Sequence, residues 1–587
     1  MLKNLMTHLL RAPAHALQAR RERRVSSALA PAIAAFSEKN YAQTVELCKE
    51  VLAREPRSAR ANLLCGQALL ELDRHADAAP YLEAAITADP DSAEAHSDHS
   101  ISLFRSGDHV AAEAACRRAV LLRPWEIRYR LRLVEFLEAT GRVQDALAEL
   151  SMALECAPER LDLLAKLSDG LRRLGLYAEM LRLAERAMLE NGENFETQLA
   201  LAVARFHTTD IHGAIEAARK AIGFSADRPE AHMVLGSSLF ELGKVDEALA
   251  SYRRALKVRP DLPDALYHIG LVHLRQGRFR EGWQGFEHRF GLEQNKTMRP
   301  CSPRWNGTSL RGRTLLVMRE QGLGDEIMYA SCYPQIIRDA RLCLIECEPR
   351  LERLFARSFP QARFFPLADL RTDEMTDPGV EVDVRSYAAS LPRYLRNSLR
   401  DFPEHQGYLR ADPVRIAFWR GRLAGLGGGL KVGISWRGGT VHSFTGKRTL
   451  PLSALLPALS VPGVHWINLQ YGRRADEITA FHGTQGIPIA DWPEAVDGDY
   501  DETAALVSAL DLVISVCTSV VHLAGALGKP VWVMAPYVPE WRYGLHGETL
   551  PWYPSACMYR QTVPGSWNPV IASVEKALRE RVAASRG

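Results

Sequence analysis

The chain has 587 residues, 47% hydrophobic and 24% charged, which is typical of soluble globular proteins and long enough for two to four domains. This composition excludes disordered and fibrous proteins. Lys and Arg total 73 against 70 for Asp and Glu, a formal charge of +3, so the chain lacks the basic surplus of a nucleic-acid-binding protein and any phosphate affinity must be local.

Residues 1–25 are predicted to form a basic N-terminal extension or helix. Their apolar stretch is interrupted by His8, Arg11 and Pro13, so it lacks the continuous apolar core of a secretory signal. No segment has the length of an integral membrane span. The ten cysteines are scattered, which is typical of reduced thiols. These features predict a cytoplasmic protein.

A 34-residue period dominates residues 26–290. Three series keep it. Prolines occupy 56, 90, 124, 158 and 260; glycines occupy 107, 141, 175, 243 and 277, with Asp73 and Thr209 in two further slots; alanines follow at 78, 112, 146, 214 and 248. Glycine suits the turn between two helices, alanine lets their backbones approach, and proline ends the second helix.

This period predicts an α-solenoid of tetratricopeptide repeats (TPR), about seven in number, over residues 26–290. Such superhelices bind a peptide or a partner helix in their concave groove. We therefore expect a protein partner in the groove, either an acceptor substrate or its chaperone. The alternative is a spacer that only positions the next domain.

Beyond residue 300 short apolar runs alternate with helical patterns, as in α/β proteins with buried parallel strands. Two Rossmann-like lobes are predicted, at 300–415 and 430–587, with a hinge at the glycine-rich run 423–429. The predicted strands are Thr314–Met318, Leu342–Cys347, Val432–Trp436, Trp466–Gln470, Leu512–Val516 and Val531–Ala535.

Gly322, Gly324 and Asp325 form the turn after the first of these strands, and a helix is expected to begin near Glu326. The turn lacks the third glycine of a dinucleotide fingerprint and the Lys-Ser/Thr of a P-loop. Glycines let a ligand approach the backbone. Asp325 is a candidate general base for an attacking hydroxyl; a plain helix cap is the alternative.

Thr518 and Ser519 follow strand 512–516 at the start of a helix, where hydroxyls and free N–H groups suit a diphosphate. His522 lies one turn later on roughly the same face as Thr518. The alternatives are a helix cap for Thr518–Ser519 and a packed core histidine for His522.

Four segments, QGLGDEIMYAS, VGISWRGG, DETAALVSALDLVISVCTSVVHLAGALGKPVWVM and WRYG…PWYPS, resemble bacterial TPR proteins with a C-terminal heptosyltransferase-like glycosyltransferase domain of the GT-B fold. The resemblance implies an inverting transfer with Asp325 as catalytic base. It implies phosphate contacts from Thr518, Ser519 and His522, with His522 the next candidate base, and a donor approach over Gly322 and Gly324. Many relatives have an aspartate where this chain has Cys517.

The same resemblance places cationic donor contacts after the third predicted strand, at Arg437, Lys447 and Arg448. A solvated loop is the alternative for these residues. Gln470 and Tyr471 are expected to contact the edge of the nucleobase or to stack on it. Trp541 and Arg542 are further candidates, with domain packing as the alternative for these two.

The acidic run Asp497–Asp501 has a DxD pair, but it directly precedes a helix and lacks the other ligands of a calcium loop, so we expect Asp501 to cap that helix. GT-B enzymes generally use helix dipoles and basic side chains instead of a metal. We predict no metal and no cofactor beyond the nucleotide-sugar substrate.

The expected function is transfer of a sugar from a nucleotide-sugar to Ser or Thr of a protein held by the repeats. Family members of this layout include flagellin glycosyltransferases, which suggests flagellin as acceptor. O-linked N-acetylglucosamine transferases share the layout, but their groove carries an asparagine ladder. The corresponding positions here are Leu64, Asp98, Arg132, Lys166, Ala200, Val234 and His268. The alternatives are a non-catalytic scaffold and an enzyme acting on a glycolipid.

Overall fold

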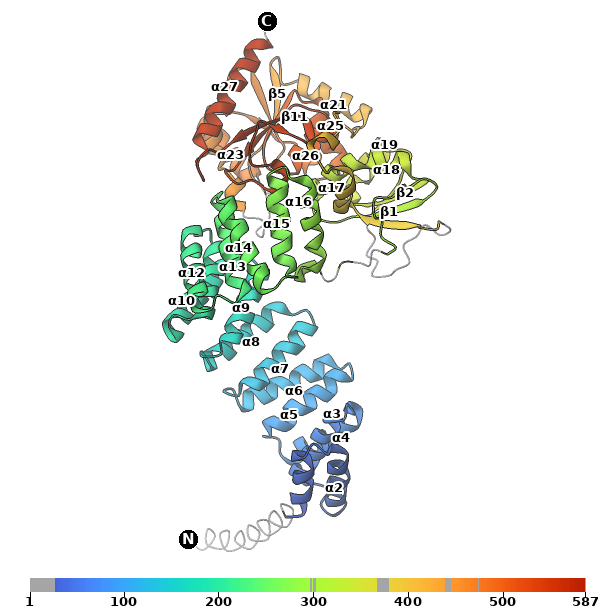
Figure 1. Cartoon of the computed structure of the whole chain (residues 1–587), viewed down its shortest axis with the longest axis vertical. Coiled ribbons are helices and arrows are strands. Elements are labelled where there is room, and N and C mark those ends of the chain that lie inside the picture. The colour runs from blue at the N-terminus through green and yellow to red at the C-terminus, as the bar shows by residue number, and fades with distance from the viewer. Residues whose placement is uncertain are drawn as a thin grey trace. The chain divides into compact units, whose positions relative to one another are not determined.

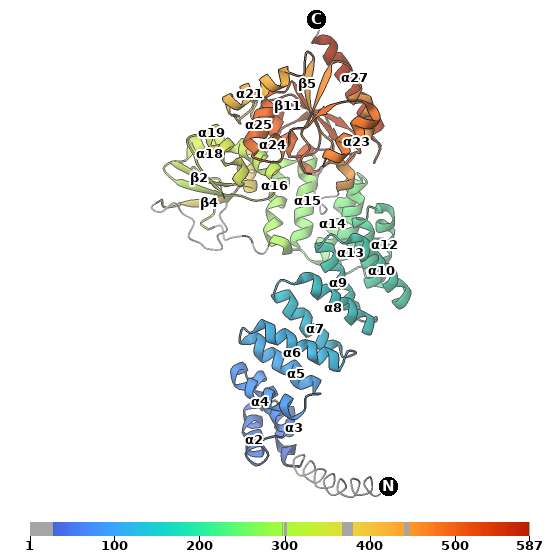
Figure 2. The same cartoon turned by 180° about the vertical axis from the view of Figure 1, so that it is seen from behind.

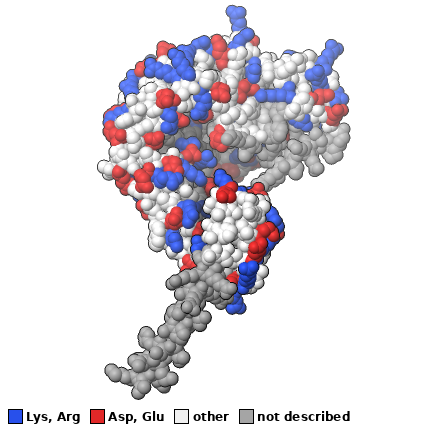
Figure 3. All heavy atoms as spheres, turned by 60° about the horizontal axis from the view of Figure 1, so that its bottom comes forward, with Lys and Arg blue, Asp and Glu red and all other residues white. Residues whose placement is uncertain are grey.

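The computed structural model describes residues 27–295, 298, 302–366, 380–438, 445–472 and 474–585, so the predicted 1–25 extension lies outside the described residues. The chain divides into two compact units, residues 1–204 and 205–587. Acidic and basic side chains are interspersed on the face seen in Figure 3, in keeping with the small net charge.

The first unit consists of antiparallel helices, and those from α2 to α10 each pack on their neighbours in sequence (Figure 1). They are a helix over 27–37, α2 (Tyr41–Arg54), α3 (Ala59–Glu71), α4 (His75–Ala88), α5 (Ala93–Arg105), α6 (His109–Leu122), α7 (Ile127–Ala139), α8 (Val143–Cys156), α9 (Leu161–Arg173), α10 (Tyr177–Asn191) and most of α11 (Phe195–His207).

The second unit continues the pattern with α12 (Ile211–Phe224), α13 (Pro229–Glu241), α14 (Val245–Val258), α15 (Pro263–Arg275) and α16 (Phe279–Phe286). The described residues thus form eight helical pairs, against about seven expected. The turn glycines have a left-handed backbone, as at Gly141 with φ +76°, and Asp73 and Thr209 adopt it too, at φ +56° and +69°. The predicted turn positions are therefore confirmed.

The spacing alanines, such as Ala78, Ala112 and Ala146, are buried between the helices of each pair. On the first helices of the repeats, Asp98 accepts hydrogen bonds from Gln67 Nε2 at 2.9 Å and Arg132 Nη1 at 3.3 Å. These positions hold mixed polar and apolar side chains, so each repeat presents a different surface.

The α/β part contains two sheets. The first has the order β3-β2-β1-β4 and is parallel, with β1 (Thr314–Met318), β2 (Leu342–Cys347), β3 (Arg363–Pro366) and β4 (Val384–Tyr387). The second has the order β10-β11-β9-β8-β5-β6-β7 and is parallel except for β10, with β5 (Leu430–Ser435), β6 (Val464–Asn468), β7 (Ile489–Ala490), β8 (Leu512–Val516), β9 (Val531–Ala535), β10 (Thr549–Leu550) and β11 (Tyr553–Arg560).

The helices of the α/β part lie between and beside these strands (Figure 2). They are α17 (Leu323–Tyr329), α18 (Tyr333–Asp339), α19 (Glu352–Ser358), α20 (Pro392–Leu395), α21 (Pro413–Ala424), α22 (Leu456–Leu459), α23 (Ala475–Gln485), α24 (Pro493–Val496), α25 (Tyr500–Ala509), α26 (Ser519–Ala526) and α27 (Asn568–Ala584).

Four of the six predicted strands have the observed bounds, whereas β5 and β6 begin two residues earlier than expected, and α17 begins at Leu323 rather than near Glu326. The predicted hinge is wrong in position. The N–H groups of Tyr408 and Leu409 already donate to Ala526 O in α26, and α21 packs on α25. The glycine-rich run 423–429 therefore lies within the second lobe.

The last helical pair joins the α/β part through buried aromatic rings. Trp283 of α16 donates from Nε1 to Arg396 O at 2.8 Å, and its ring contacts Trp541 with centroids 5.3 Å apart. One apolar core contains side chains from α15, α16 and both sheets. This packing holds α15 beside the carboxyl ends of the strands.

Candidate active site

A cavity of about 1280 Å³ lies where the two sheets and α15 meet. It adjoins the carboxyl ends of β1 and β8, near the point in each sheet where strand order reverses, which is the usual ligand position in open α/β sheets. Its wall includes Tyr267, Leu271, Arg275, Arg289, Arg319, Glu320, Gln321, Gly322, Leu323, Gly324, Asp325, Arg350, Arg448, Tyr471, Cys517, Thr518, Ser519, His522, Glu540, Trp541, Arg542 and Tyr543.

The turn after β1 brings α17 close to α26. A Cβ at Gly324 would lie 3.0 Å from His522 Cδ2 and 3.1 Å from Ser519 Cα, so only glycine fits between the two helices without displacement. Gly322 N–H donates to Asp325 Oδ2 at 3.2 Å, so Asp325 also caps its helix. The two turns identified in the sequence therefore meet in one cavity.

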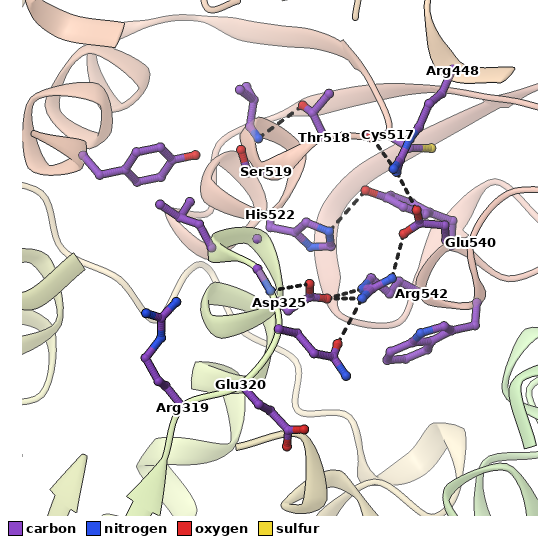
Figure 4. A pocket seen from close by; sticks show the side chains of 18 of the residues that line it. Arg319, Glu320, Asp325, Arg448, Cys517, Thr518, Ser519, His522, Glu540 and Arg542 are labelled. Atoms are coloured by element: carbon purple, nitrogen blue, oxygen red, sulfur yellow. Dashed lines mark hydrogen bonds and ion pairs between the residues drawn. The ribbon is translucent and has the colours of Figure 1, made fainter. Parts of the chain in front are cut away.

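Asp325 belongs to a chain of buried charges (Figure 4). Its carboxylate pairs with Arg542, whose Nη1 lies 2.7 Å from Glu540, and Glu540 in turn lies 2.7 Å from Arg448 Nη1. Burial raises the pKa of Asp325, while Arg542 opposes the rise. A carboxylate held in one orientation with a raised pKa is suited to accept a proton.

The backbone leading to this turn is anchored from the end of the repeats. Arg289 lies in a short helix, η1 (Glu287–Gly291), and donates two hydrogen bonds to Glu320, at 2.9 and 2.8 Å. Both side chains are buried, and Glu320 also accepts from Ala389 N–H at 3.0 Å. Two residues after Glu320 the glycine turn begins, so this pair fixes its starting point.

The start of α26 has the geometry of an anion site. Thr518 caps the helix, accepting from Val520 N–H at 3.3 Å and contacting Ser515 Oγ at 3.0 Å. The first N–H groups of a helix lack partners within it, and the helix dipole is positive there. Arg448 lies beside it, donating to Cys517 O at 3.3 Å.

Cys517 precedes this helix and is buried, which raises the pKa of its thiol to about 12. The thiol is therefore protonated at neutral pH and brings no negative charge to the start of α26.

His522 lies in a closed hydrogen-bonded group. Nδ1 is 3.0 Å from Tyr553 Oη and Nε2 is 3.2 Å from Tyr543 Oη. Burial lowers the pKa of His522 to about 3, so the ring is neutral, with one nitrogen donating and the other accepting. In this geometry neither nitrogen is available to a phosphate or an acceptor hydroxyl, which favours the alternative of a packed core histidine.

Three of the predicted donor residues point elsewhere. Arg437 pairs with Glu477 at 2.8 Å, Lys447 pairs with Glu241 of α13, and Gln470 accepts from the N–H groups of Trp436 and Arg437. None of the three lines the described cavity. Their contacts are structural because they fix the end of β5 and the loop that follows it.

Arg448 and Tyr471, by contrast, line the cavity, and Tyr471 is 52% exposed. Its ring has a free face for a planar group.

The acidic run is occupied by arginine partners. Asp501 makes two 2.6 Å hydrogen bonds with Arg357, and Asp497 lies 2.6 Å from Arg474. Asp499, not Asp501, caps α25, which corrects the expectation. Among the described residues, no three His, Cys, Asp or Glu side chains are grouped to hold a metal ion.

Sequence reasoning missed Glu540, Arg275, Arg289 and Glu320. It treated Arg542 only as a possible contact with the nucleobase of the donor. Asp325 and Arg542 are 217 residues apart, and no local motif links them. The one sequence feature that could have pointed to Arg542 is its position next to Trp541, beside other aromatic residues.

Comparison with known proteins identifies the repeats and one relative that covers most of the chain. Tetratricopeptide-repeat models match residues 35–97 and 103–167, and a TPR repeat model matches residues 236–277. Protein FlbA of Caulobacter vibrioides is 31% identical over 434 residues, which cover 70% of this chain and 72% of FlbA. The chain belongs to the FlbA family. The predicted repeats are confirmed in the matched segments.

Other similarities are more distant. The BBSome complex member bbs-4 of Caenorhabditis elegans is 24% identical over 196 residues, 31% of this chain and 41% of that protein. Solved structures of Naa15/Naa10 bound to HypK and of the APC/C Cut9-Hcn1 assembly are each 14% identical, with TM-scores of 0.33 and 0.28. Each covers 46% of this chain, and the chain spans about half of theirs: 42% and 54%.

In the described part of the chain, no helix combines the length and the apolar character that crossing a membrane requires.

Proposed function

We propose that this FlbA-family protein is a glycosyltransferase with a GT-B-type domain, which moves a sugar from a nucleotide-sugar to a Ser or Thr hydroxyl of a protein held by the repeats. The observation that carries the proposal is the meeting of two helix starts in one cavity: Asp325 at the start of α17, and Thr518 and Ser519 at the start of α26. The first offers a base and the second an anion site, which are the two groups that displacement of a diphosphate requires.

The reaction is a single displacement. Asp325 takes the proton of the acceptor hydroxyl as its oxygen attacks the anomeric carbon, and the bond from that carbon to the diphosphate breaks. The departing oxygen keeps the electron pair, and the start of α26 and Arg448 stabilise its charge. Arg542 and Gly322 N–H hold the Asp325 carboxylate in place before the proton arrives. Tyr471 offers an exposed ring to the base of the donor.

The protein acceptor would lie in the groove of the repeats, and a flagellin is the acceptor that the resemblance of the sequence favours. The test is to incubate the purified protein with UDP-, ADP-, GDP- and CMP-sugars and with flagellin from the source cells, and to measure intact protein mass. We expect one donor to add its sugar mass to flagellin, and Asp325→Asn to abolish the shift. No mass shift with any donor would contradict the proposal.

A scaffold without catalysis is the second candidate. It is favoured by the pairing of Asp325 with Arg542 and by the closed hydrogen bonds of His522, because both candidate bases among the described pocket residues already have side-chain partners. The mass measurement separates the two functions, since a scaffold would leave flagellin unmodified with every donor.

A further inference from the structure

The wall of the cavity includes one face of the last repeat. Tyr267, Leu271 and Arg275 are four residues apart on α15, so they share one side of the helix, and all three line the cavity. Helix α15 is fixed there because Arg275 O accepts a hydrogen bond from Leu545 N–H at 3.1 Å. The repeat array thus contributes side chains to the same space as Asp325 and Thr518.

Arg275, unlike Arg448 and Arg542 in this space, makes no ion pair with a carboxylate of the described residues. Its Nε and Nη1 atoms are buried, and neither has a hydrogen-bond partner among the described residues. Its guanidinium carbon lies 4.1 Å from the centre of the Phe240 ring, so the ring fixes the position of the cation without supplying an acceptor. A buried donor without an acceptor is costly in the ligand-free protein.

The nearby carboxylates are already shared with other cations. Glu540 binds Arg448 through Oε1 and Arg542 through Oε2, and Glu241 binds Lys447. Asp325 is held by Arg542. This part of the described structure therefore has four cations and three carboxylates. Arg275 is the cation that forms no hydrogen bond with any of the three carboxylates.

We propose that Arg275 binds a phosphate oxygen of the ligand, so that the last repeat and the α/β domain form one composite phosphate site. The inference rests on the proposed function for the identity of the natural ligand, the diphosphate of a nucleotide-sugar. A phosphate group supplies the acceptors that Arg275 lacks and balances the surplus positive charge. Burial, which lowers the pKa of Arg275 to about 10, leaves the side chain charged at neutral pH.

The test is calorimetric titration of inorganic pyrophosphate and of the nucleoside diphosphates UDP, ADP, GDP and CDP into the full chain. Arg275→Gln should weaken pyrophosphate binding, and that of whichever nucleotide binds, by at least about tenfold, the effect expected for a lost charge-assisted hydrogen bond. Arg275→Lys should restore part of this loss. Arg278→Gln is the matched control, since Arg278 pairs with Glu281 at the surface and does not line the cavity, and it should bind like the wild type.

Thermal melting without ligand separates this role from a structural one. An arginine kept for a ligand leaves the ligand-free protein no less stable when replaced by glutamine, because an unsatisfied buried charge is removed. We therefore expect Arg275→Gln to melt at or above the wild-type temperature. A clear decrease in melting temperature, or wild-type affinity for pyrophosphate in Arg275→Gln, would overturn the inference.

The same variants separate this inference from the transferase itself. A wild-type protein that glycosylates its acceptor, with Arg275→Gln at full nucleotide affinity, would contradict the Arg275 site alone. Loss of pyrophosphate binding in Arg275→Gln, with no sugar transfer by the wild type, would support the site and contradict the transferase. A wild type that binds neither pyrophosphate nor any nucleotide would contradict both.

Discussion

Arg74 and Asp77, at the start of α4, form an ion pair with 53% and 55% of their side chains exposed, whereas Arg289 and Glu320 form one with 2% and 6% exposed. The first pair lies within three residues of sequence on the repeat surface, and the second joins the end of the repeats to the β1 turn. Water screens the first pair, so it contributes little to stability. In the second pair, protein contacts replace water around both charges. Removing either partner would therefore lower the free energy of unfolding substantially.

Charged side chains therefore have different roles in the two regions. In the repeats, most ion pairs lie on the surface of a fold that the packing of alanine and leucine determines, although Arg130–Glu149 is largely buried. In the pocket, the chain Arg448–Glu540–Arg542–Asp325 sets the position and protonation of the groups that would meet a ligand. Substitutions in the two regions should therefore have effects of different kind and size.

The largest effect is expected at Asp325. Asp325→Asn keeps the size of the side chain but removes the proton acceptor, so sugar transfer should fall by roughly two to four orders of magnitude. Nucleotide affinity should stay the same or rise slightly, because a negative charge leaves an anion-binding pocket. Initial rates and calorimetry measure the two quantities.

Asp412→Asn is the matched control, since Asp412 also caps a helix but does not line the pocket. It should transfer sugar at the wild-type rate. If Asp325→Asn is also fully active, Asp325 is only a helix cap.

Removing Arg289 should have the next largest effect. Arg289→Met leaves Glu320 buried without its cation, at a cost of about 3–5 kcal/mol in the free energy of unfolding. Arg74→Met, at the exposed pair, should leave that free energy nearly unchanged. Urea unfolding of both variants measures the contrast, and equal losses would refute the distinction between buried and exposed pairs.

Much of the repeat region could be predicted from sequence because its determinants are local and recur every 34 residues. By residue type alone, Gly141 indicates a turn and Ala146 indicates a close contact between two helices. The two pocket turns could also be predicted, because glycines or hydroxyl side chains between a buried strand and a helix are typical of a ligand-binding turn.

The partners of those turns could not be predicted. Three segments supply Arg542, Arg275 and Arg289, and these segments meet only when the last repeat packs on both sheets. The sequence around an arginine does not indicate whether its side chain will be buried. Conversely, Arg437 and Lys447 looked like ligand contacts because they follow a strand, but carboxylates on α23 and α13 bind them. Local motifs identified the turns, whereas tertiary packing selected the charges.

An intermediate effect is expected from pH. Burial lowers the pKa of His522 to about 3, below its value of about 6.5 when unfolded, so between these values the unfolded chain binds more protons. The stability contribution is complete above pH 6.5 and decreases as pH falls toward 3, by roughly 2 kcal/mol between pH 6.5 and 5. His522→Gln should flatten this slope in urea unfolding measured at several pH values.

His268, whose pKa burial lowers to about 4, remains in both proteins and cancels in their comparison. An unchanged slope in His522→Gln would show that this histidine is not held neutral.

The smallest effect is expected at a repeat turn. Thr209 has φ +69°, a conformation unfavourable for a β-branched residue, so Thr209→Gly should stabilise the protein by about 0.5–1 kcal/mol. Thr208→Gly, one residue earlier and outside the left-handed region, should not be stabilising. Thermal melting checks both, and destabilisation by Thr209→Gly would contradict the account of the turn.

The most direct test of the central claim is titration of the wild type and of the double variant Thr518→Ala/Ser519→Ala with UDP, ADP, GDP and CDP. If the start of α26 binds phosphate, one of these nucleotides binds the wild type at one site per chain. The double variant should bind it at least about tenfold more weakly while losing only about 1 kcal/mol of stability from the missing cap. Equal affinity in the two proteins, or no binding to either, would show that the start of α26 is not a phosphate site.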